Sequence, residues 1–530
     1  MRKPLVLSLC GAAAVCALVA DLAVGQLIDR NLAPNIGNFG IAKTYAEQIG
    51  AGRGSITTPN SSLFIINRDP FRAIRRGRQI FQRKFTRANG AGPLTGDGGG
   101  PVADDVSIGA GLADSCAACH GRPRGSAGFG GDVATRPDSR DAPHLFGLGL
   151  KEMLGDEITA QLRAIKAAAI SEARRTRRNV TRDLVVTQGT RYGQITARPD
   201  GTTDNSRITG VDVDLRVKPF FHHGGTISMR EFLVGAFNAE MGLESPDPDL
   251  NKASRDKARI VTPAGMVLDG FLDTIETPPA KDERDDPDGD LILNEVPESI
   301  VDFMEFYLLH YFKAGRGETN ATTGRGRDLM RTVGCTSCHI QDMTIAKDRR
   351  VADVETVFDP ARGNPFNRSF STATPSLTEV NDGSGHPTLK KPNGAPFNVR
   401  FIFTDFKRHD LGPNFYENEY GGGTRRMFIT TALWGVGNTG PYGHDGRSMT
   451  LNDVILRHGG EAQAVRDRFN ALPASDKSAI VAFLSSLTLF PPDDIASNLD
   501  PGDRTDPRYP QFGHGSIRLG ALFNNPADPE

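Results

Sequence analysis

The segment Cys116-Ala117-Ala118-Cys119-His120 has the pattern C-x-x-C-H, and Cys335-Thr336-Ser337-Cys338-His339 repeats it. In such a box the two thiols add to the vinyl groups of haem, and the adjacent imidazole ligates the iron from one face. The alternatives are half of a zinc site or a thioredoxin-like redox pair. The only other cysteines, Cys10 and Cys16, lie in the first 16 residues, so none remains to complete a zinc site. The sequence therefore predicts two covalent haem c groups, with these attachment residues and iron ligands: Cys116, Cys119, His120, Cys335, Cys338 and His339.

The N-terminus has the features of a secretory signal. Arg2 and Lys3 precede an apolar run over residues 5–20, and small residues at 23–25 offer a cleavage site before Gln26. We expect residues 1–25 to be removed and the mature chain to be periplasmic or secreted from a bacterium. After Gln26 no apolar run approaches the roughly 20 residues that span a bilayer, so no membrane span is predicted.

The length and composition predict a mainly α fold in several units. A chain of 530 residues exceeds one compact core. Its 59 glycines and 34 prolines favour long irregular loops and little β structure. The formal net charge of −2 argues against nucleic acid or an anionic membrane as the main partner. The predicted divisions are a signal peptide at 1–25, an irregular N-terminal arm at 26–72, an N-terminal haem domain of cytochrome c type at 73–280, an acidic linker at 281–296, a C-terminal haem domain of the same type at 297–495 and a tail at 496–530.

Apolar periodicity predicts five helices. Two of them lead into the haem boxes, in the way a cytochrome c opens with a helix. The helix over 152–177 runs into the basic stretch Arg174-Arg175-Thr176-Arg177-Arg178, which is either a solvated helix end or a docking patch for an acidic redox partner. The five predicted ranges are 73–85, 152–177, 297–312, 326–333 and 475–487.

The acidic linker has the character of a calcium loop. Asp286, Asp288 and Asp290 alternate around Gly289, and Glu295 follows. A hard cation needs several oxygens brought round a tight bend, and this spacing supplies them, although the glutamate arrives at position ten rather than twelve of an EF-hand loop. The sequence predicts either a calcium site or a solvated acidic linker.

An internal repeat relates the two halves of the chain. The segment 219–229 aligns without a gap on 441–451, and 145–149 aligns on 433–437. Pro219 lies 103 residues after Cys116, and Pro441 lies 106 residues after Cys335. The chain is therefore predicted to be a duplicated haem unit with different loop insertions.

The repeat predicts that the two irons differ. Extending the alignment places His458 opposite Ala236, and a methyl group cannot ligate iron. We therefore predict an iron held by His339 and His458 that handles electrons, and a first iron with an open position for chemistry. The alternatives are that His458 lies on the surface, or that a histidine in the first half reaches the first iron. Those histidines are His144, His222 and His223.

Several residues near Ala236 are candidates for the chemistry. Glu240 follows Ala236 by four residues, which places both on one face of a helix. A carboxyl group there can move a proton between the oxygens of peroxide. His222 matches His444 in the repeat, and a supporting role is predicted for both. The phenylalanines of this segment form either a distal wall or ordinary core: Phe220, Phe221, Phe232 and Phe237.

These motifs resemble the bacterial di-haem cytochrome c peroxidase and MauG superfamily. The resemblance rests on the two boxes, on Thr439-Gly440-Pro441-Tyr442-Gly443-His444-Asp445-Gly446, and on Asn238-Ala239-Glu240-Met241. It implies that the N-terminal haem binds hydrogen peroxide, that Glu240 assists its cleavage, and that the C-terminal haem passes electrons from a small redox protein or other donor, with calcium between the domains. His458 departs from the methionine or tyrosine of the family. The single tryptophan, Trp434, leaves the family's bridging tryptophan without a clear counterpart.

The chain is also similar to the rubber oxygenases, which are di-haem relatives that cleave carbon–carbon double bonds with dioxygen. His458, Phe237 and the pair Phe221-His222 carry this similarity, although the pair has histidine where those proteins have tryptophan. Peroxide chemistry, dioxygen chemistry on an apolar substrate and electron transfer alone are thus the three functions to be separated.

Overall fold

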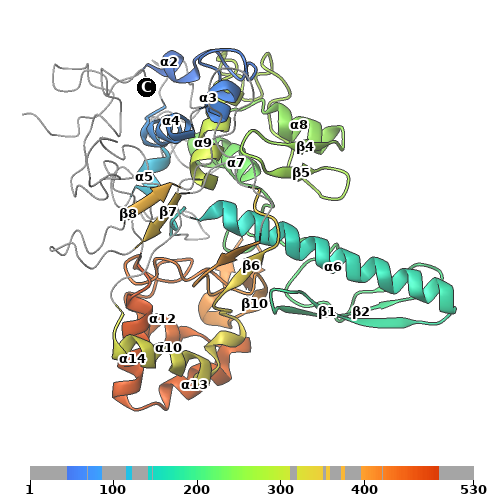
Figure 1. The fold of residues 1–530 in the computed structure, drawn as a ribbon, viewed down its shortest axis with the longest axis vertical. Helices are drawn as coiled ribbons and strands as arrows, with labels where there is room; N and C mark the ends of the chain where they lie inside the picture. Colours follow the sequence, from blue (N-terminus) through green and yellow to red (C-terminus); the bar gives the residue numbers. More distant parts are fainter. Residues whose placement is uncertain are drawn as a thin grey trace, which may run out of the picture.

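The computed structural model of the chain describes residues 44–68, 70–85, 115–121, 141–145, 147–310, 319–349, 396–419 and 422–488, with two short strands at 354–357 and 372–375. The predicted signal segment, the glycine run ending at Gly100 and the C-terminal tail lie outside these residues. Helices dominate, as predicted, and the sheets are small (Figure 1). In the described part of the chain, no helix is both long and apolar enough to cross a bilayer.

The five predicted helices are present within a few residues of their expected bounds. The longest, α6, begins four residues earlier than predicted. The predicted helix over 297–312 is described as far as His310. The helices are α2 Tyr45–Ile49, α3 Ser62–Arg68, α4 Pro70–Gln82, α5 Cys116–His120, α6 Leu148–Thr176, α7 Met229–Met241, α8 Pro248–Arg255, α9 Glu298–His310, α10 Ala321–Val333, α12 Leu451–Arg457, α13 Gln463–Asn470 and α14 Ala474–Ser485.

The strands form one three-stranded antiparallel sheet and several two-stranded pairs. The sequence analysis did not predict the three-stranded sheet, β1-β2-β3, which follows directly after α6 (Figure 1). Its register pairs Val180 with Ala197. The strands are β1 Val180–Val185, β2 Arg191–Ala197, β3 Thr203–Asp204, β4 Arg259–Val261, β5 Val267–Asp269, β6 Met343–Ile345, β7 Val354–Val357, β8 Thr372–Pro375, β9 Phe397–Val399, β10 Arg408–Asp410, β11 Glu417–Asn418, β12 Thr424–Arg425 and β13 Met427–Ile429.

The N-terminal arm is more ordered than predicted, because it contains α2, α3 and the start of α4. Helix α2 begins with a capping box in which Thr44 and Glu47 satisfy each other's backbone amides. Between α2 and α3, Arg53 binds Asp302 of α9 and Asp249 of α8. These contacts to distant residues fix the arm, and apolar periodicity along the arm does not report them.

A glycine at a close helix crossing precedes each box. Helix α4 packs on α9, and α10 packs on α14. A Cβ atom at Gly77 would lie 2.2 Å from the Phe303 carbonyl oxygen, and one at Gly326 would lie 1.9 Å from the Ala479 carbonyl oxygen. Both glycines stand in an Arg-Gly-Arg triplet, at 76–78 and 325–327. The helix that precedes each box in the chain is therefore held against a later helix by direct backbone contact.

The repeat found in the sequence is also present in the backbone. An isolated antiparallel bridge joins Phe220 to Thr226, and another joins Tyr442 to Ser448 at the equivalent positions. The hydroxyl of Ser228 then caps α7 in the first half. Its counterpart Thr450 caps α12 in the second. The same turn thus leads into a helix in both halves.

Candidate active site

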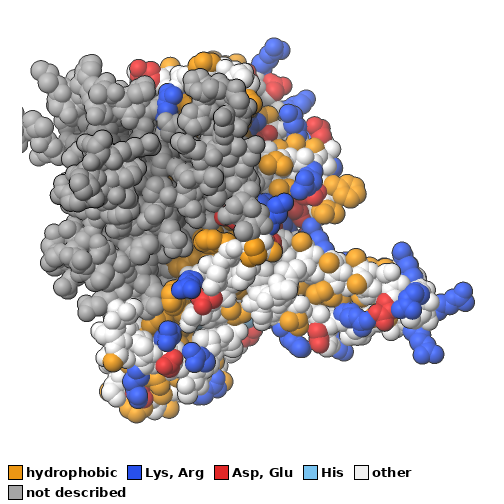
Figure 2. All heavy atoms as spheres, in the orientation of Figure 1, with side chains coloured by type: hydrophobic (Ala, Val, Ile, Leu, Met, Phe, Trp, Pro, Cys, Tyr) orange, Lys and Arg blue, Asp and Glu red, His pale blue; other side chains and the backbone are white. Residues whose placement is uncertain are grey.

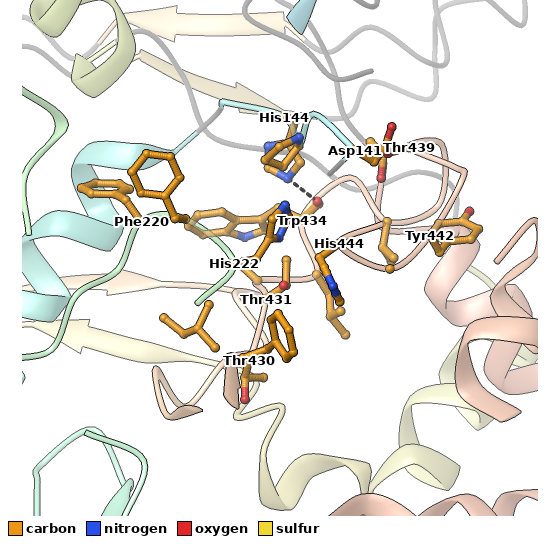
Figure 3. A pocket seen from close by; sticks show the side chains of 18 of the residues that line it. Asp141, His144, Phe220, His222, Thr430, Thr431, Trp434, Thr439, Tyr442 and His444 are labelled. Atoms are coloured by element: carbon orange, nitrogen blue, oxygen red, sulfur yellow. Dashed lines mark hydrogen bonds between the residues drawn. The ribbon is translucent and has the colours of Figure 1, made fainter. Parts of the chain in front are cut away.

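Both C-x-x-C-H boxes line one continuous cavity of about 540 Å³. Its walls come from α5, α7 and the start of α6 in the first half, and from α10, α12 and α14 in the second. Figure 3 shows part of this cavity, with residues of both halves around it. Most of the lining side chains are apolar, which suits a flat hydrophobic ligand.

The first box forms the short helix α5. The hydroxyl of Ser115 caps this helix by accepting a hydrogen bond from the Ala118 amide. The His120 Nδ1 atom lies 2.7 Å from the Pro143 carbonyl oxygen. Burial lowers the pKa of His120 to about 4, so the ring is neutral at physiological pH.

The second box begins with a 3-10 turn over Cys335–Ser337, directly after α10. The His339 Nδ1 atom lies 3.0 Å from the Phe403 carbonyl oxygen. Burial lowers the pKa of His339, so this imidazole is also neutral.

His458 ends α12 and lines the same cavity as His339. Its Nδ1 atom lies 2.7 Å from the Val454 carbonyl oxygen, and the edge of its ring meets Phe415 at 5.3 Å between centroids. Burial lowers its pKa to about 4. The half-buried side chain therefore faces the cavity that the second box also lines.

These three imidazoles share one hydrogen-bond arrangement. In each ring Nδ1 is held by a backbone carbonyl, which fixes the proton there and leaves the Nε2 lone pair for a metal. The four box cysteines form no disulfide bond with one another. Burial raises the pKa of Cys116 to about 12 and that of Cys335 to about 11, unlike the depressed pKa of a redox-active thiolate. The chemistry of these residues fits two haem c groups, which the thiols would bond and the imidazoles would ligate.

A competing metal site involves Cys338. In the described residues Cys338, Asp405 and His409 come close enough to share an ion. However, both His409 nitrogens are already engaged, with Asp405 at 2.9 Å and Glu461 at 2.8 Å. Burial would lower the pKa of His409, but Asp405 and the Cys338 thiol group beside it raise that pKa to about 11. With each nitrogen bonded to a carboxylate, this imidazole offers no lone pair to a metal, which favours the haem interpretation of the second box.

Helix α7 forms the cavity wall in the first half. Ala236 and Glu240 both line the cavity, one helical turn apart. Phe232 also lines it, with its ring 4.7 Å from that of Phe221. Phe237 does not lie in the cavity wall: it is 1% exposed and meets Phe85 edge to face in the core. Phe237 was predicted to lie at the site, because helix periodicity alone does not show which face of α7 meets the cavity.

The other candidate histidines lie in different surroundings. His144 Nε2 lies 2.7 Å from the Trp434 carbonyl oxygen, as the dashed line in Figure 3 shows. His222 lines the cavity with its ring 5.8 Å from that of His444, so the two repeat-related histidines face each other. His223 stacks on Phe221 and is not part of the cavity wall.

Two lining residues were missed or left unplaced by the sequence analysis. Trp434 is 3% exposed and lies beside Gly147, where an added Cβ would come within 2.6 Å of its ring. It therefore stands where the two halves meet. Lys151 of α6 points its ammonium group toward Phe220, 5.8 Å from the ring centre. Burial lowers the pKa of Lys151 to about 8.

The acidic linker brings together a different set of carboxylates from that predicted. Asp286 and Asp288 gather with Glu244, which follows α7. Asp290 accepts a hydrogen bond from the Ile292 amide, and Glu295 accepts one from the Glu244 amide at 2.7 Å. Burial and the neighbouring aspartates raise the pKa of Glu244 to about 7. Spacing along the loop could not show Glu244, because it is about 40 residues away in the chain.

The site so described has two C-x-x-C-H boxes on one cavity, with His458 in the wall of the second half and Ala236 at the aligned position of the first. A comparison with known families supports a di-haem oxidoreductase. Residues 365–487 match the family described as "Di-haem oxidoreductase, putative peroxidase". The matched segment contains Trp434, His444 and His458 and lies after the second box. No curated protein matches the chain.

Proposed function

We propose that the chain is an exported di-haem c-type oxidoreductase that reduces hydrogen peroxide at the first box and receives electrons at the second. The observation that carries this proposal is the contrast between Ala236 and His458 on one cavity. The family match supports an oxidoreductase with a peroxidase role. The signal-like N-terminus supports a periplasmic location, where haem c is attached.

The chain's own residues divide the work between the two halves. Cys116, Cys119 and His120 would hold one haem, and Cys335, Cys338, His339 and His458 the other; the bound haem supplies the redox-active iron in each half. His458 closes its side of the cavity to small ligands. Ala236 leaves space in the first half, beside the aromatic wall of Phe221 and Phe232.

Glu240 is the group placed to handle the proton. It is half-buried on the cavity face of α7, one helical turn from Ala236. Peroxide cleavage requires one oxygen to lose a proton and the other to gain one. A carboxyl group with two oxygens can perform both transfers from one position.

Spectroscopy of the purified holoprotein tests the proposal. We expect two covalent haems per chain and, in the oxidised EPR spectrum, one high-spin or water-ligated haem beside one low-spin haem. Peroxide added to the reduced protein should be consumed. Low-spin signals alone in both oxidation states would leave an electron-transfer cytochrome as the function. Loss of covalent haem in Cys116→Ser and in Cys335→Ser separately would identify the two attachment sites.

The apolar wall favours a second candidate, an oxygenase that acts on an apolar substrate with dioxygen. Phe220, Phe221 and Phe232 pack against one another at the cavity. A protein that retains bound dioxygen after purification and does not consume peroxide would support this function and reject the peroxidase.

Calcium is proposed at Glu244, Asp286 and Asp288. These three carboxylates lie within reach of one ion. One oxygen of Asp288, Oδ2, is buried and has no hydrogen-bond partner in the described part of the chain. A hard cation with oxygen ligands would satisfy it. Titration of the chelator-treated protein with calcium, in the parent and in Asp288→Asn, tests the site.

A further inference from the structure

A projecting arm is built from the second half of α6 and the sheet β1-β2-β3. Helix α6 has 29 residues and so spans about 43 Å. Its first part is buried in the main core through Leu154, Ile158 and Leu162. The rest extends away from the body together with the sheet (Figure 1).

The arm has a small core of its own. Ala169 and Ala173 of α6 are buried against Val180 and Ala197 of the sheet. The short alanine side chains let the sheet lie close to the helix, and Tyr192 ties the base of the sheet to the body by donating a hydrogen bond to the Asp405 carbonyl oxygen at 2.9 Å. The arm is therefore an ordered projection attached to the body of the protein.

The outer end of the arm is strongly basic. The whole arm, residues 163–207, contains ten Lys and Arg but four Asp and Glu, in a chain whose net charge is −2, and Arg163 at its base pairs with Asp273 of the body. Arg182 and Arg191 neutralise Glu172 and Asp183. Five further arginines are exposed, and none of them takes part in a salt bridge in the described residues: Arg174, Arg175, Arg177, Arg178 and Arg198. Figure 2 shows the basic side chains gathered at this end.

Stabilisation of the helix does not account for this cluster. Arg174 and Arg175 lie in the last turn of α6, where a positive charge interacts favourably with the helix dipole. Arg177 and Arg178 lie beyond the helix, and Arg198 comes from the turn between β2 and β3. Three segments thus contribute charge to one surface.

The side-chain types at the tip of the arm indicate which class of partner the arm binds. Protein interfaces are usually centred on a desolvated aromatic or large aliphatic anchor. The tip has none: among the large exposed apolar side chains of the described residues, the arm contributes Val185 alone between 163 and 207. Guanidinium groups bind phosphate through paired hydrogen bonds. A convex tip bearing several of them can meet many phosphates at once on a flat surface.

We propose that the arm docks the protein electrostatically on a lipid bilayer with anionic phosphate headgroups. The arginines at the tip of the arm contact the bilayer, and the body of the protein with its cavity does not. This inference does not depend on the proposed haem chemistry. It also revises the expectation, drawn from the net charge of −2, that an anionic membrane is not the main partner. A net charge summed over the whole chain does not show that positive charge is concentrated on the arm.

Sedimentation with lipid vesicles tests the proposal on the full-length holoprotein. One set of vesicles consists of phosphatidylcholine alone, and the other also contains about 30% of the anionic lipid phosphatidylglycerol. We expect binding to the anionic vesicles at low salt and release at high salt. Changing Arg174, Arg175, Arg177 and Arg178 together to Gln should lower the partition coefficient at least about 100-fold.

A matched variant removes four charges elsewhere. Lys252, Lys257, Arg259 and Arg331 are exposed and lie off the arm, and their replacement by Gln should leave vesicle binding nearly unchanged. Absence of binding by the parent protein, or equal loss in both variants, overturns the proposal. Binding to soluble polyglutamate but not to vesicles also overturns it, and points to an acidic protein as the partner. Circular dichroism and haem content establish that each variant is folded.

Discussion

Replacement of Gly326 by alanine tests the helix crossing that holds the second box. The new Cβ would lie 1.9 Å from the Ala479 carbonyl oxygen and 2.9 Å from Phe483 Cβ. Carbon atoms do not approach a carbonyl so closely, so α10 and α14 must move apart by about 1 Å. Overpacking of this kind costs about 1–3 kcal/mol. Alanine also gains about 1 kcal/mol of helix propensity over glycine, so we expect a net loss of stability of up to about 2 kcal/mol.

Gly324 provides the control on the same helix. An added Cβ there meets no atom within 4 Å. Gly324→Ala should therefore stabilise the protein by up to about 1 kcal/mol, because the propensity gain has no steric cost. Both substitutions replace glycine by alanine on the same helix, and their effects on the free energy of unfolding are expected to have opposite signs.

Urea unfolding of the holoprotein, followed by far-ultraviolet circular dichroism, measures both variants. The midpoint should fall for Gly326→Ala and rise for Gly324→Ala, with similar slopes. The first-half crossing predicts the same loss for Gly77→Ala, where the Cβ would meet the Phe303 carbonyl oxygen at 2.2 Å. If Gly326→Ala proves as stable as Gly324→Ala, the close crossing is absent and the geometry proposed for the helix entering the box is wrong.

Three further predictions concern the site and its support. Glu240→Gln should slow peroxide turnover by about 10²-fold or more, measured by stopped flow, with exposed Glu283→Gln as the control; unchanged kinetics would remove Glu240 from the proton transfer. His458→Ala should let carbon monoxide bind the reduced second haem, and a haem that stays closed would show that another residue ligates it. Burial raises the pKa of Glu305 to about 7, from an ordinary value of 4.5. Ionising this carboxyl therefore costs stability, so the free energy of unfolding of Glu305→Gln should rise relative to the parent between about pH 4.5 and 7; parallel urea profiles across that range would contradict the assignment.

The sequence predicted those parts of the fold that depend on local pattern. Helices α6, α9 and α14 follow from apolar periodicity, and the helical lead-in to each box was expected. The repeat was visible because its residues align without a gap, and the structure shows the same bridge and helix cap in both halves.

Contacts between distant segments could not be predicted in this way. The buried Arg230 of α7 binds Asp247, Asp302 and Glu305 from three segments. Such a cluster has no spacing rule, although an arginine inside an otherwise apolar helix face is a signal that carboxylates must meet it. Glu244 joined the acidic linker for the same reason, through a contact that the order of residues does not reveal.

The contact between His144 of the first half and the Trp434 carbonyl oxygen of the second predicts how truncating mutations would behave. Each half supplies part of the wall of the shared cavity. A truncated protein that contained only one box would therefore expose the apolar cavity wall to solvent. Such a product would be expected to aggregate or be degraded rather than persist as a smaller cytochrome. Frameshifts and deletions in either half should then behave alike in a genetic screen, as complete losses of the protein.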